Sequence, residues 1–537
     1  MNLQYMATRF RFVAASLLIL SLIVTPTWKV QAGNASLPIW HILRPQPSGI
    51  ISPEVQRQLA QAQAEQAVTV IVRLKQDADI AHGNDLKREE RLTRVIEALT
   101  VTADRTQGPI KKFLEERQRK GTIREFTSFW IFNGFSVTAT PVAIREIAAQ
   151  PNVLSITPDA LNIVPAIAPP VLDNPEPNIN LINAPALWSM GYTGDGVVIA
   201  SMDTGVSLSQ PDLAAQWRGG TNSWFDPYGN YTSPTDLDGH GTGIMGIMVG
   251  GNTSGTDIGV APSAQWIAVK MFDDQMLTTA TAVHAGYQWL LDPDGDPTTA
   301  DAPQVVNNSW AYGTPGCFLE FEPDLQALRA AGILAIFAAG NGGPSANTSY
   351  SPANNPSAFA VGAVNNSDII YGLSSRGPSS CGGSTGVFPE LTAPGVAINT
   401  TDLGGFFTSE TGTSIAAPHV TGGLALLLSA YSNISATQQE DALRYSAFDL
   451  GIAGPDDTYG YGRLDLLAAF QWLENPPPPP TLQPTSTGTP TDTPTITTTP
   501  PTPTLQPTST GTPTDTPTNT TTPPTPTDTA TFTPVPD

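Results

Sequence analysis

Three short segments of this chain carry an acid, an imidazole and a hydroxyl, in that order. They read Ser-Met-Asp203-Thr-Gly, Asp-Gly-His240-Gly-Thr and Gly-Thr-Ser414-Ile-Ala-Ala-Pro. A serine hydroxyl is too weak an acid to ionise alone, so a base must take its proton while it attacks a carbonyl carbon. A carboxylate must then hold that base in the correct tautomer and stabilise its charged form. The three side chains therefore have the chemistry of acyl transfer through a serine nucleophile.

Each of the three residues also fits a structural role when it is taken alone. Asp203 follows the apolar run Val197–Ala200 and could form a turn at a strand end. His240 lies between two glycines, where it could be an ordinary buried histidine. Ser414 could be the N-cap of the helix that the apolar run after it predicts. Taken together with their long flanking segments, the three favour the catalytic interpretation.

The order of the three residues separates this chain from other serine hydrolases. Asp, His and then Ser is the order of subtilisin, and Ser414 does not lie in the G-x-S-x-G elbow of the α/β-hydrolases. The chain therefore resembles the subtilisin-like serine peptidases, the subtilases of peptidase family S8. The stretch Ile182–Gly196 resembles the opening of their catalytic domain, and Gly460–Asp465 resembles its closing segment. The resemblance covers roughly residues 68–472.

The resemblance also implies an oxyanion donor and two walls of a substrate cleft. Acyl transfer develops negative charge on the carbonyl oxygen, so a donor must point at that oxygen. Asn341, after the strand-like run Ile333–Ala339, matches the family's amide donor, although an Asn-Gly pair alone also predicts a turn. The implied substrate-binding residues are Ser309, Trp310 and Ala311 on one wall, and Ala338, Ala339 and Gly340 on the other.

Two residues of the first wall depart from the family pattern. Trp310 stands where subtilisin has a smaller apolar residue, and Ala311 stands where the family commonly has glycine. A methyl group at residue 311 narrows the expected pocket entrance, which leaves the preferred P1 residue of the substrate open. Gly243 follows the catalytic histidine where subtilisins commonly have a second histidine, which is not a triad member. We expect His284 and His419 to be structural.

The elements that must position these residues follow from hydrophobic periodicity. Residues 165–475 alternate apolar strand runs with helical segments, which predicts an α/β fold: a mostly parallel sheet with helices on both faces. Extended peptides bind the edge of such a sheet by main-chain hydrogen bonds. We therefore expect protein or peptide substrates to pair with the strand around residues 305–311.

Residues 68–164 form a second, smaller unit with a different balance of charge. Strand patterns at 68–74, 129–137 (a strand pair or one bent strand) and 152–158 alternate with helical patterns at 85–105, 111–120 and 141–148. This β-α-β-β-α-β order predicts a small α+β, ferredoxin-like domain. It resembles the inhibitor-type (I9) propeptide, which implies an intramolecular chaperone and inhibitor. The unit has 14 basic and 12 acidic residues, whereas residues 166–475 have 6 and 29, so the two attract weakly at low salt.

The two ends of the chain have the composition of export and linker segments. In residues 1–32, Arg9 and Arg11 precede an apolar run and a small-residue cleavage site, which predicts a secretory signal, with a retained membrane anchor as the alternative. Residues 33–67 are a lead segment. Residues 476–537 are a Pro/Thr tail with a 23-residue repeat, too poor in apolar residues to fold. The tail could be a glycosylated stalk that holds the protein at a cell surface, or a plain linker.

The chemistry requires no cofactor, although structural calcium is a candidate. Asp212 matches a family calcium ligand, and Asp292, Asp294 and Asp296 offer three carboxylates in one turn, although a solvated acidic loop explains them equally simply. The two cysteines, Cys317 and Cys381, could pair in an exported protein, but spacing alone does not place them side by side.

The sequence therefore predicts a secreted serine endopeptidase that is made as a self-processed zymogen and acts as a monomer. Its net charge of −22 disfavours nucleic acid as a partner, and no segment after the signal is long and apolar enough to cross a membrane. Two rival functions remain: a binding protein that keeps a decayed peptidase fold, and an esterase or transferase that uses the same acyl chemistry.

Overall fold

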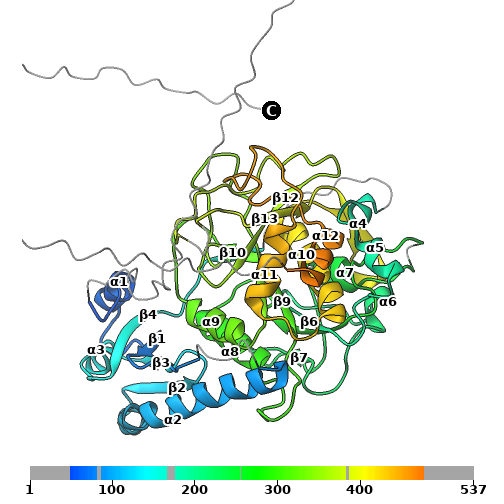
Figure 1. Cartoon of the computed structure of the whole chain (residues 1–537). Helices are drawn as coiled ribbons and strands as arrows, with labels where there is room; N and C mark the ends of the chain where they lie inside the picture. Colours follow the sequence, from blue (N-terminus) through cyan, green and yellow to red (C-terminus); the bar gives the residue numbers. More distant parts are fainter. Residues whose placement is uncertain (1–48, 81–85, 166–175, 254, 383–385, 477–537) are drawn as a thin grey trace, which may run out of the picture. The chain divides into compact units, whose positions relative to one another are not determined.

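The computed structural model describes residues 49–80, 86–165, 176–253, 255–382 and 386–476 (Figure 1). All of these residues belong to one compact unit. The predicted signal segment and the repeat tail after residue 476 lie outside the described residues.

The first part of this unit is a small α+β domain. Its elements are α1 (Pro53–Gln61), β1 (Val68–Leu74), α2 (Arg88–Arg119), β2 (Ile123–Phe129), β3 (Gly134–Ala139), α3 (Pro141–Ala148) and β4 (Val153–Pro158). The strands form an antiparallel sheet in the order β2-β3-β1-β4. From β1 to β4 this is the predicted β-α-β-β-α-β order. The helix α1, from the lead segment, also belongs to this domain, because Val55 and Leu59 are buried in its core.

Helix α2 is longer than the sequence predicted. The two helical patterns at 85–105 and 111–120 form one helix of 32 residues with Pro109 inside it (Figure 1). A proline in a helix removes a hydrogen bond and favours a break. The helix continues because both halves are anchored by packing: Ile110 and Leu114 lie in the core of the small domain, whereas Leu92 and Ile96 pack against the large domain.

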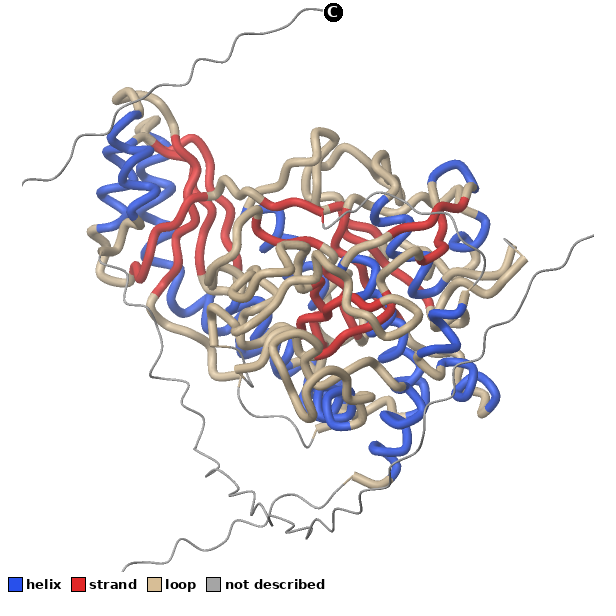
Figure 2. The backbone as a smooth tube through the Cα atoms, turned by 90° about the horizontal axis from the view of Figure 1, so that it is seen from above, coloured by secondary structure: helices blue, strands red, loops and turns tan. Residues whose placement is uncertain are grey.

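The large domain is built on one parallel sheet. Its strands are β6 (Val198–Asp203), β7 (Trp224–Phe225), β8 (Gln265–Lys270), β9 (Val305–Asn308), β11 (Leu334–Ala338), β12 (Phe359–Val364) and β13 (Leu391–Pro394). Their order across the sheet is β13-β12-β11-β9-β6-β8-β7, and every pair is parallel. Figure 2 shows these strands in red among the helices. The predicted α/β class is confirmed.

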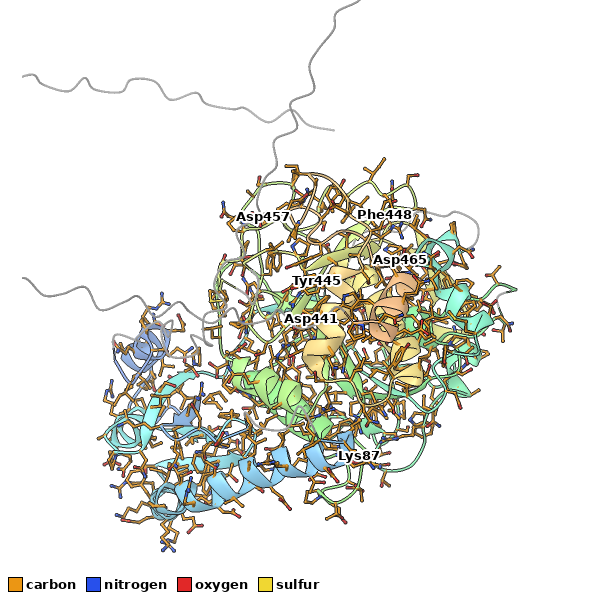
Figure 3. All side chains as sticks on the ribbon, in the orientation of Figure 1. Lys87, Asp441, Tyr445, Phe448, Asp457 and Asp465 are labelled. Atoms are coloured by element: carbon orange, nitrogen blue, oxygen red, sulfur yellow. A yellow bond between two sulfur atoms is a disulfide. The ribbon has the colours of Figure 1, made fainter. Side chains whose placement is uncertain are left out.

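Helices and short ribbons surround the sheet. The helices are α4 (Pro177–Leu181), α5 (Ala184–Ser189), α6 (Pro211–Ala214), α7 (His240–Val249), α8 (Ala280–Leu291), α9 (Glu322–Ala330), α10 (Thr413–Ala430), α11 (Ala436–Tyr445) and α12 (Leu466–Glu474). Two strand pairs lie outside the main sheet: β5 (Ile163–Pro165) with β10 (Trp310–Tyr312), and β14 (Ile398–Thr401) with β15 (Phe407–Glu410). Asp465, labelled in Figure 3, is the N-cap of α12, and its carboxylate accepts from the N–H of Ala468 at 3.0 Å.

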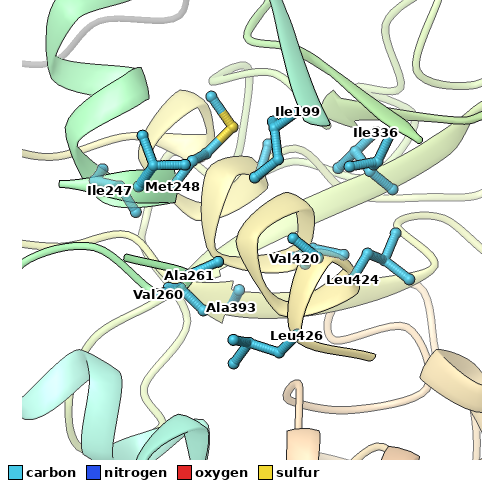
Figure 4. Close-up of a cluster of buried hydrophobic side chains, with 14 of the residues drawn as sticks. Ile199, Ile247, Met248, Val260, Ala261, Ile336, Ala393, Val420, Leu424 and Leu426 are labelled. Atoms are coloured by element: carbon cyan, nitrogen blue, oxygen red, sulfur yellow. The ribbon is translucent and has the colours of Figure 1, made fainter. Parts of the chain in front are cut away.

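Side chains of the strands alternate between two apolar cores, as the period of a strand requires. Ile199 and Ile336 face one core, where they lie with residues of α7 and α10 (Figure 4). Ala200 and Phe337 face the other core, under α8 and α9. Both faces of the sheet are therefore covered by helices, which explains the near-continuous apolar runs of its strands.

Helix α10 crosses the first of these cores and packs against α7 and five strands of the sheet. Close approach to α7 depends on Gly422, because a Cβ at that residue would lie 3.1 Å from the carbonyl oxygen of Met248. Among the described residues, α10 alone is long and apolar enough to cross a membrane, and 89% of it is buried inside the protein. A core helix passes the same test of length and composition.

Candidate active site

The first pair of predicted site residues meets at the carboxyl ends of the parallel strands. Asp203 is the last residue of β6, and His240 is the first residue of α7. Nδ1 of His240 donates to Oδ1 of Asp203 at 2.7 Å, and both side chains are only 1% exposed. The carboxylate therefore fixes the ring in the tautomer that leaves Nε2 available.

Two close contacts at Gly241 hold α7 against the end of β6. The N–H of Gly241 donates to the hydroxyl of Thr204 at 2.9 Å. A Cβ on Gly241 would lie 2.1 Å from the carbonyl oxygen of Gly205, so only glycine fits there. The preceding Gly239 has φ 105°, in the left-handed region that favours glycine. The glycines that flank His240 are therefore required by the backbone.

The electrostatic surroundings of His240 favour its charged form. Burial lowers the pKa of the ring, but Asp203, Glu410 and Asp238 more than offset burial and raise that pKa to about 9. Within the described part of the chain, Nε2 has no hydrogen-bond partner although it is buried. A buried nitrogen without a partner costs free energy, and such groups in native proteins call for an explanation such as catalysis.

Ser414 lies in the first turn of α10, which α7 packs against. The helix contains Pro418, which has no N–H to donate to the carbonyl four residues earlier. The freed carbonyl of Ser414 accepts instead from the hydroxyl of Ser309 at 2.9 Å. Ser309 was expected to line the substrate cleft, and the structure gives its side chain this positioning contact.

Asn341 lies beside the start of the same helix. Its Oδ1 accepts from the backbone N–H of Thr413 at 3.0 Å and from the hydroxyl of Thr413 at 3.1 Å. In the described residues, the buried Nδ2 of Asn341 has no hydrogen-bond partner. The side chain is therefore oriented through its oxygen by the residue that precedes Ser414, and its amide N–H groups remain available as donors.

The residues before Asn341 form the second predicted wall. Ala338 and Ala339 are fully buried, one in each apolar core. Gly340 has φ +100°, and a Cβ there would lie 2.5 Å from the ring of Tyr350. The backbone, rather than the side chains of the two alanines, is therefore what this wall can offer to a ligand.

Strand β10, which lies outside the main sheet, already has an extended partner. It pairs antiparallel with β5, so that Ala311 lies opposite Val164 and Trp310 opposite Pro165. This is the mode expected for a peptide substrate, and the strand that occupies it comes from the end of the small domain.

The sequence predicted that Trp310 lines the substrate cleft, but in the structure its side chain lies in the core. The indole is fully buried in the core under α9 and packs edge-to-face against Phe321 and Phe337. Alternate side chains of a strand point to opposite faces, so the backbone of residue 310 can pair with a peptide while its side chain fills the core. Trp310 therefore does not form a pocket wall with its ring.

The small domain also docks on α8 and α9. The ring of Phe132 packs at a tilt against the ring of His284 with centroids 4.2 Å apart, and Thr157 donates to Glu320 at 3.1 Å. Nδ1 of His284 donates to Asp324 at 3.0 Å. His284 is thus a buried structural residue that lies at the contact between the two domains.

Two arginines of α2 extend this contact. Nη2 of Arg88 donates to the carbonyl oxygens of Ala302 and Pro303 at 2.8 and 2.9 Å. Nε of Arg91 donates to the carbonyl of Ala331, the C-cap of α9, at 3.3 Å. A cation at a helix C-terminus interacts favourably with the helix dipole. The N-terminal half of α2 is therefore a docking segment for the large domain.

His419 and the two cysteines make contacts that support the fold. His419 accepts at Nε2 from Asn178 at 2.9 Å and donates from Nδ1 to the carbonyl of Ile415 at 2.9 Å. Burial lowers the pKa of this histidine to about 4, so it stays neutral. Cys317 and Cys381 form a disulfide.

The candidate metal ligands form two separate groups. Oδ1 of Asp212 accepts from the backbone N–H of Thr253 at 2.9 Å, and in the described residues its buried Oδ2 has no partner. In the acidic turn, the carboxylates that come within 4.8 Å of one another belong to Asp292, Asp294 and Asp301. Asp296, expected in this group, instead accepts from the N–H and hydroxyl of Thr298, which shape the turn.

Sequence reasoning missed two residues of the site. Thr413 orients Asn341, and its place directly before Ser414 was the available signal. Glu410 lies near His240 and affects its pKa, but no spacing in the sequence pointed to it.

The parallel sheet, the Asp–His pair at its carboxyl edge and the docked α+β domain define a class of hydrolase that is synthesised with its own inhibitor. Comparisons with known proteins support this class. The model of the subtilase family matches residues 194–462, and the model of the peptidase inhibitor I9 family matches residues 69–161. The chain belongs to the subtilase family and is a serine endopeptidase with an I9-type propeptide.

Three of the similar proteins come from species of Bacillus. Subtilisin E of Bacillus subtilis (strain 168) is 34% identical over 346 residues, which cover 64% of this chain and 82% of that protein. Subtilisin of Bacillus pumilus is 36% identical over 296 residues, or 55% of this chain and 98% of that protein. Bacillopeptidase F of Bacillus subtilis (strain 168) is 34% identical over 416 residues, which cover 71% of this chain but only 28% of that longer protein.

Proposed function

We propose that this subtilase hydrolyses peptide bonds with Ser414 as nucleophile, His240 as general base and Asp203 as the residue that orients His240. The observation that carries the proposal is the buried 2.7 Å bond from His240 to Asp203, with Nε2 of His240 left without a partner in the described residues. Apo active sites commonly tighten the bond from base to nucleophile only when substrate binds.

In the proposed reaction, His240 accepts the proton of Ser414 and later returns a proton to the leaving group. The oxygen of Ser414 attacks the substrate carbonyl carbon, and its proton passes to Nε2 of His240. The negative oxygen that forms accepts from Nδ2 of Asn341, which Thr413 holds in place. His240 then gives the proton to the leaving amine, and an acyl-enzyme remains. Water attacks this ester with His240 again as base, and Ser414 recovers its proton.

We also propose that residues 68–164 are the propeptide and residues 165–475 the catalytic domain of a self-processed zymogen. The pairing of β5 with β10 supports this division, because it places the end of the small domain on the edge strand that a substrate would use. The cut is expected between Val164 and Asn178. Part of this interval, residues 166–175, lies outside the described residues.

Calcium would be structural in this enzyme. The buried Oδ2 of Asp212 has no partner in the described residues, and an oxygen of this kind fits a hard cation. Asp212 would supply one ligand of such an ion, although the loop at residues 252–257 departs from the family's calcium-binding pattern. Oδ1 of Asp292 is also buried without a partner within the described part of the chain, and the pKa of Asp292 is raised to about 6 by burial and by Asp301 and Asp294. No step of the proposed hydrolysis uses a metal.

The remaining proposals rest on the sequence and on the relatives. Residues 1–32 would direct secretion and the Pro/Thr tail could hold the enzyme at a surface, which is compatible with a disulfide that persists outside the cell. The mature enzyme is expected to be a monomer that acts on proteins or peptides.

Labelling with a fluorophosphonate, which reacts with activated serines, tests this function. The mature protein should be labelled and the Ser414→Ala variant should not. An unlabelled but folded wild-type protein would instead support the binding-protein alternative. Parallel assays of matched peptide and ester substrates separate a peptidase from an esterase, because only the former turns over the amide.

A further inference from the structure

A second carboxylate lies close to the catalytic pair. Glu410 ends β15, four residues before Ser414, and its side chain is half-buried. A Cβ built on Gly243, one turn along α7 from His240, would lie 3.6 Å from Oε1 of Glu410. The carboxylate therefore rests against the first turn of the helix that carries the catalytic base.

The contact depends on the absence of a side chain at residue 243. The same built Cβ would lie 3.3 Å from Cγ2 of Thr400 and 3.3 Å from the carbonyl oxygen of Thr401, so any side chain there would meet β14 as well as Glu410. The hydroxyl of Thr401 donates to the carbonyl of Thr242 at 2.7 Å, which fastens β14 to α7. The ribbon that carries Glu410 is thus held against the helix by bonds that do not involve the carboxylate.

The charged groups around His240 come from several elements. Asp203 ends β6, and Asp238 precedes α7 and accepts from the backbone N–H of His240 at 3.2 Å. Asp402, after β14, lies beside Gly239, and Glu410 ends β15. The cation of neighbouring β8, Lys270, donates to the carbonyl oxygens of Thr204 and Phe272 at 3.1 and 3.0 Å.

Of these four carboxylates, Glu410 is the one best placed to act through charge alone. Asp203 forms the orienting bond, Asp238 bonds to the backbone N–H of His240, and Asp402 accepts from the N–H of Leu403 at 2.7 Å. The charge of Glu410 raises the pKa of His240 more than the charge of Asp238 does. Burial raises the pKa of Glu410 itself, and the charge of His240 opposes that rise, as expected for two groups that interact.

We propose that Glu410 is a positioning residue of the peptidase reaction, a second carboxylate that stabilises the imidazolium of His240 while it holds the proton of Ser414. The inference rests on the proposed roles of His240 and Ser414. Negative charge at Glu410 lowers the energy of the charged ring in the transition state, because that ring carries its positive charge only after the proton arrives. The same charge makes the free enzyme need a higher pH to supply neutral His240.

The test compares the pH dependence of kcat/KM for a peptide substrate in mature wild-type enzyme and in Glu410→Gln. The acid limb should move to lower pH by about 0.5 to 1 unit, since removal of one nearby charge lowers the pKa of the free base. The value of kcat on the alkaline plateau should fall about 3- to 10-fold. Glu410→Asp should restore most of both quantities.

Glu474→Gln is the matched control, because it removes one exposed carboxylate from α12 in the same domain. Its pH profile should match the wild type. An unshifted acid limb in Glu410→Gln, or an equal shift in the control, would overturn the role of Glu410. Were Glu410→Gln not to fold, Glu410→Thr would remove the same charge with a residue suited to a strand, and the same shift is required of it.

The outcome also separates this proposal from the proposed function. If wild-type enzyme reacts with the fluorophosphonate at Ser414 while the profiles of wild type and Glu410→Gln coincide, only the role of Glu410 fails. If folded wild-type enzyme is neither labelled nor active, the failure lies in the proposed triad, and with it the role of Glu410 falls.

Discussion

At the scale of single residues, the Asp203 carboxylate fixes the tautomer of His240 and does not react itself. It accepts from Nδ1 of His240 and thereby leaves Nε2 without a proton when the ring is neutral. Thr413 does the same for Asn341, because it occupies the amide oxygen and leaves the amide N–H groups available. In the proposed reaction, Ser414 therefore depends on two residues that orient its partners, Asp203 for His240 and Thr413 for Asn341.

Replacement of Asp203 by Asn should leave the fold intact and lower kcat by about 10⁴-fold, because an amide favours the wrong tautomer of His240. Single-turnover kinetics with a peptide substrate would measure this loss. A variant that retained a tenth of the wild-type kcat would contradict the assigned role.

Replacement of Asn341 by Ala should lower kcat by about 10²- to 10³-fold with little change in KM, because the amide contacts the oxygen only once it is charged. Thr413→Val, which removes the hydroxyl contact but keeps the backbone one, should cost less. Steady-state kinetics of the two variants give the comparison. An Asn341→Ala enzyme that lost affinity instead of turnover would argue against an oxyanion contact.

The meeting of Asp203 and His240 was predictable, because each lies in a short local pattern of strand end, turn or helix start. The side chain of Trp310 was not, because a sequence does not tell which face of an edge strand meets the core. Glu410 was also missed, since its contact with α7 depends on how the β14–β15 ribbon packs.

At the scale of elements, α2 shows how tertiary packing overrides a local signal. Gly108 and Pro109 predict a break, yet the helix runs from Arg88 to Arg119 because two different cores hold its halves. The sequence pattern identified the helical character of both halves. It could not reveal that the first half docks on another domain.

The docking segment of α2 yields a prediction for propeptide release. Arg91→Ala removes a buried charged donor from the end of α9, so the cleaved propeptide should leave about 10-fold faster. The lag before activity appears in freshly processed enzyme measures this rate. Arg119→Ala, at the exposed far end of the same helix, should leave the lag unchanged. Equal lags in all three proteins would refute the docking role.

At the scale of the whole molecule, the stability of the uncleaved protein should depend on pH through His284, which lies at the contact between the two domains. Burial lowers the pKa of this histidine, but Asp324 and Glu320 outweigh burial and raise it to about 9. A folded-state pKa above the unfolded value of about 6.5 stabilises the fold fully below pH 6.5. That contribution is lost as pH rises toward 9.

Thermal unfolding of the uncleaved Ser414→Ala zymogen should therefore show a Tm that falls between about pH 6.5 and 9. Addition of His284→Gln should flatten this dependence, because the titrating ring is gone. A slope that is unchanged by His284→Gln would assign the pH effect to other groups.

The arrangement of two domains and the class of each fold followed from composition and periodicity, since strand and helix patterns alternate clearly in both. Long-range contacts did not follow in the same way. The sequence left open whether Cys317 and Cys381 pair, and in the structure they form a disulfide. The sequence did not show that Asp301 lies beside Asp292 and Asp294, because this proximity depends on the path of the chain between residues 292 and 301.

The most direct test of the account is the N-terminal sequence of the purified protein, expressed from residue 33 onward as wild type and as Ser414→Ala. Self-processing predicts that wild type begins at a residue between 165 and 178, whereas Ser414→Ala keeps its propeptide. The same new N-terminus in both proteins, or an intact propeptide in a folded wild type, would contradict cleavage by Ser414.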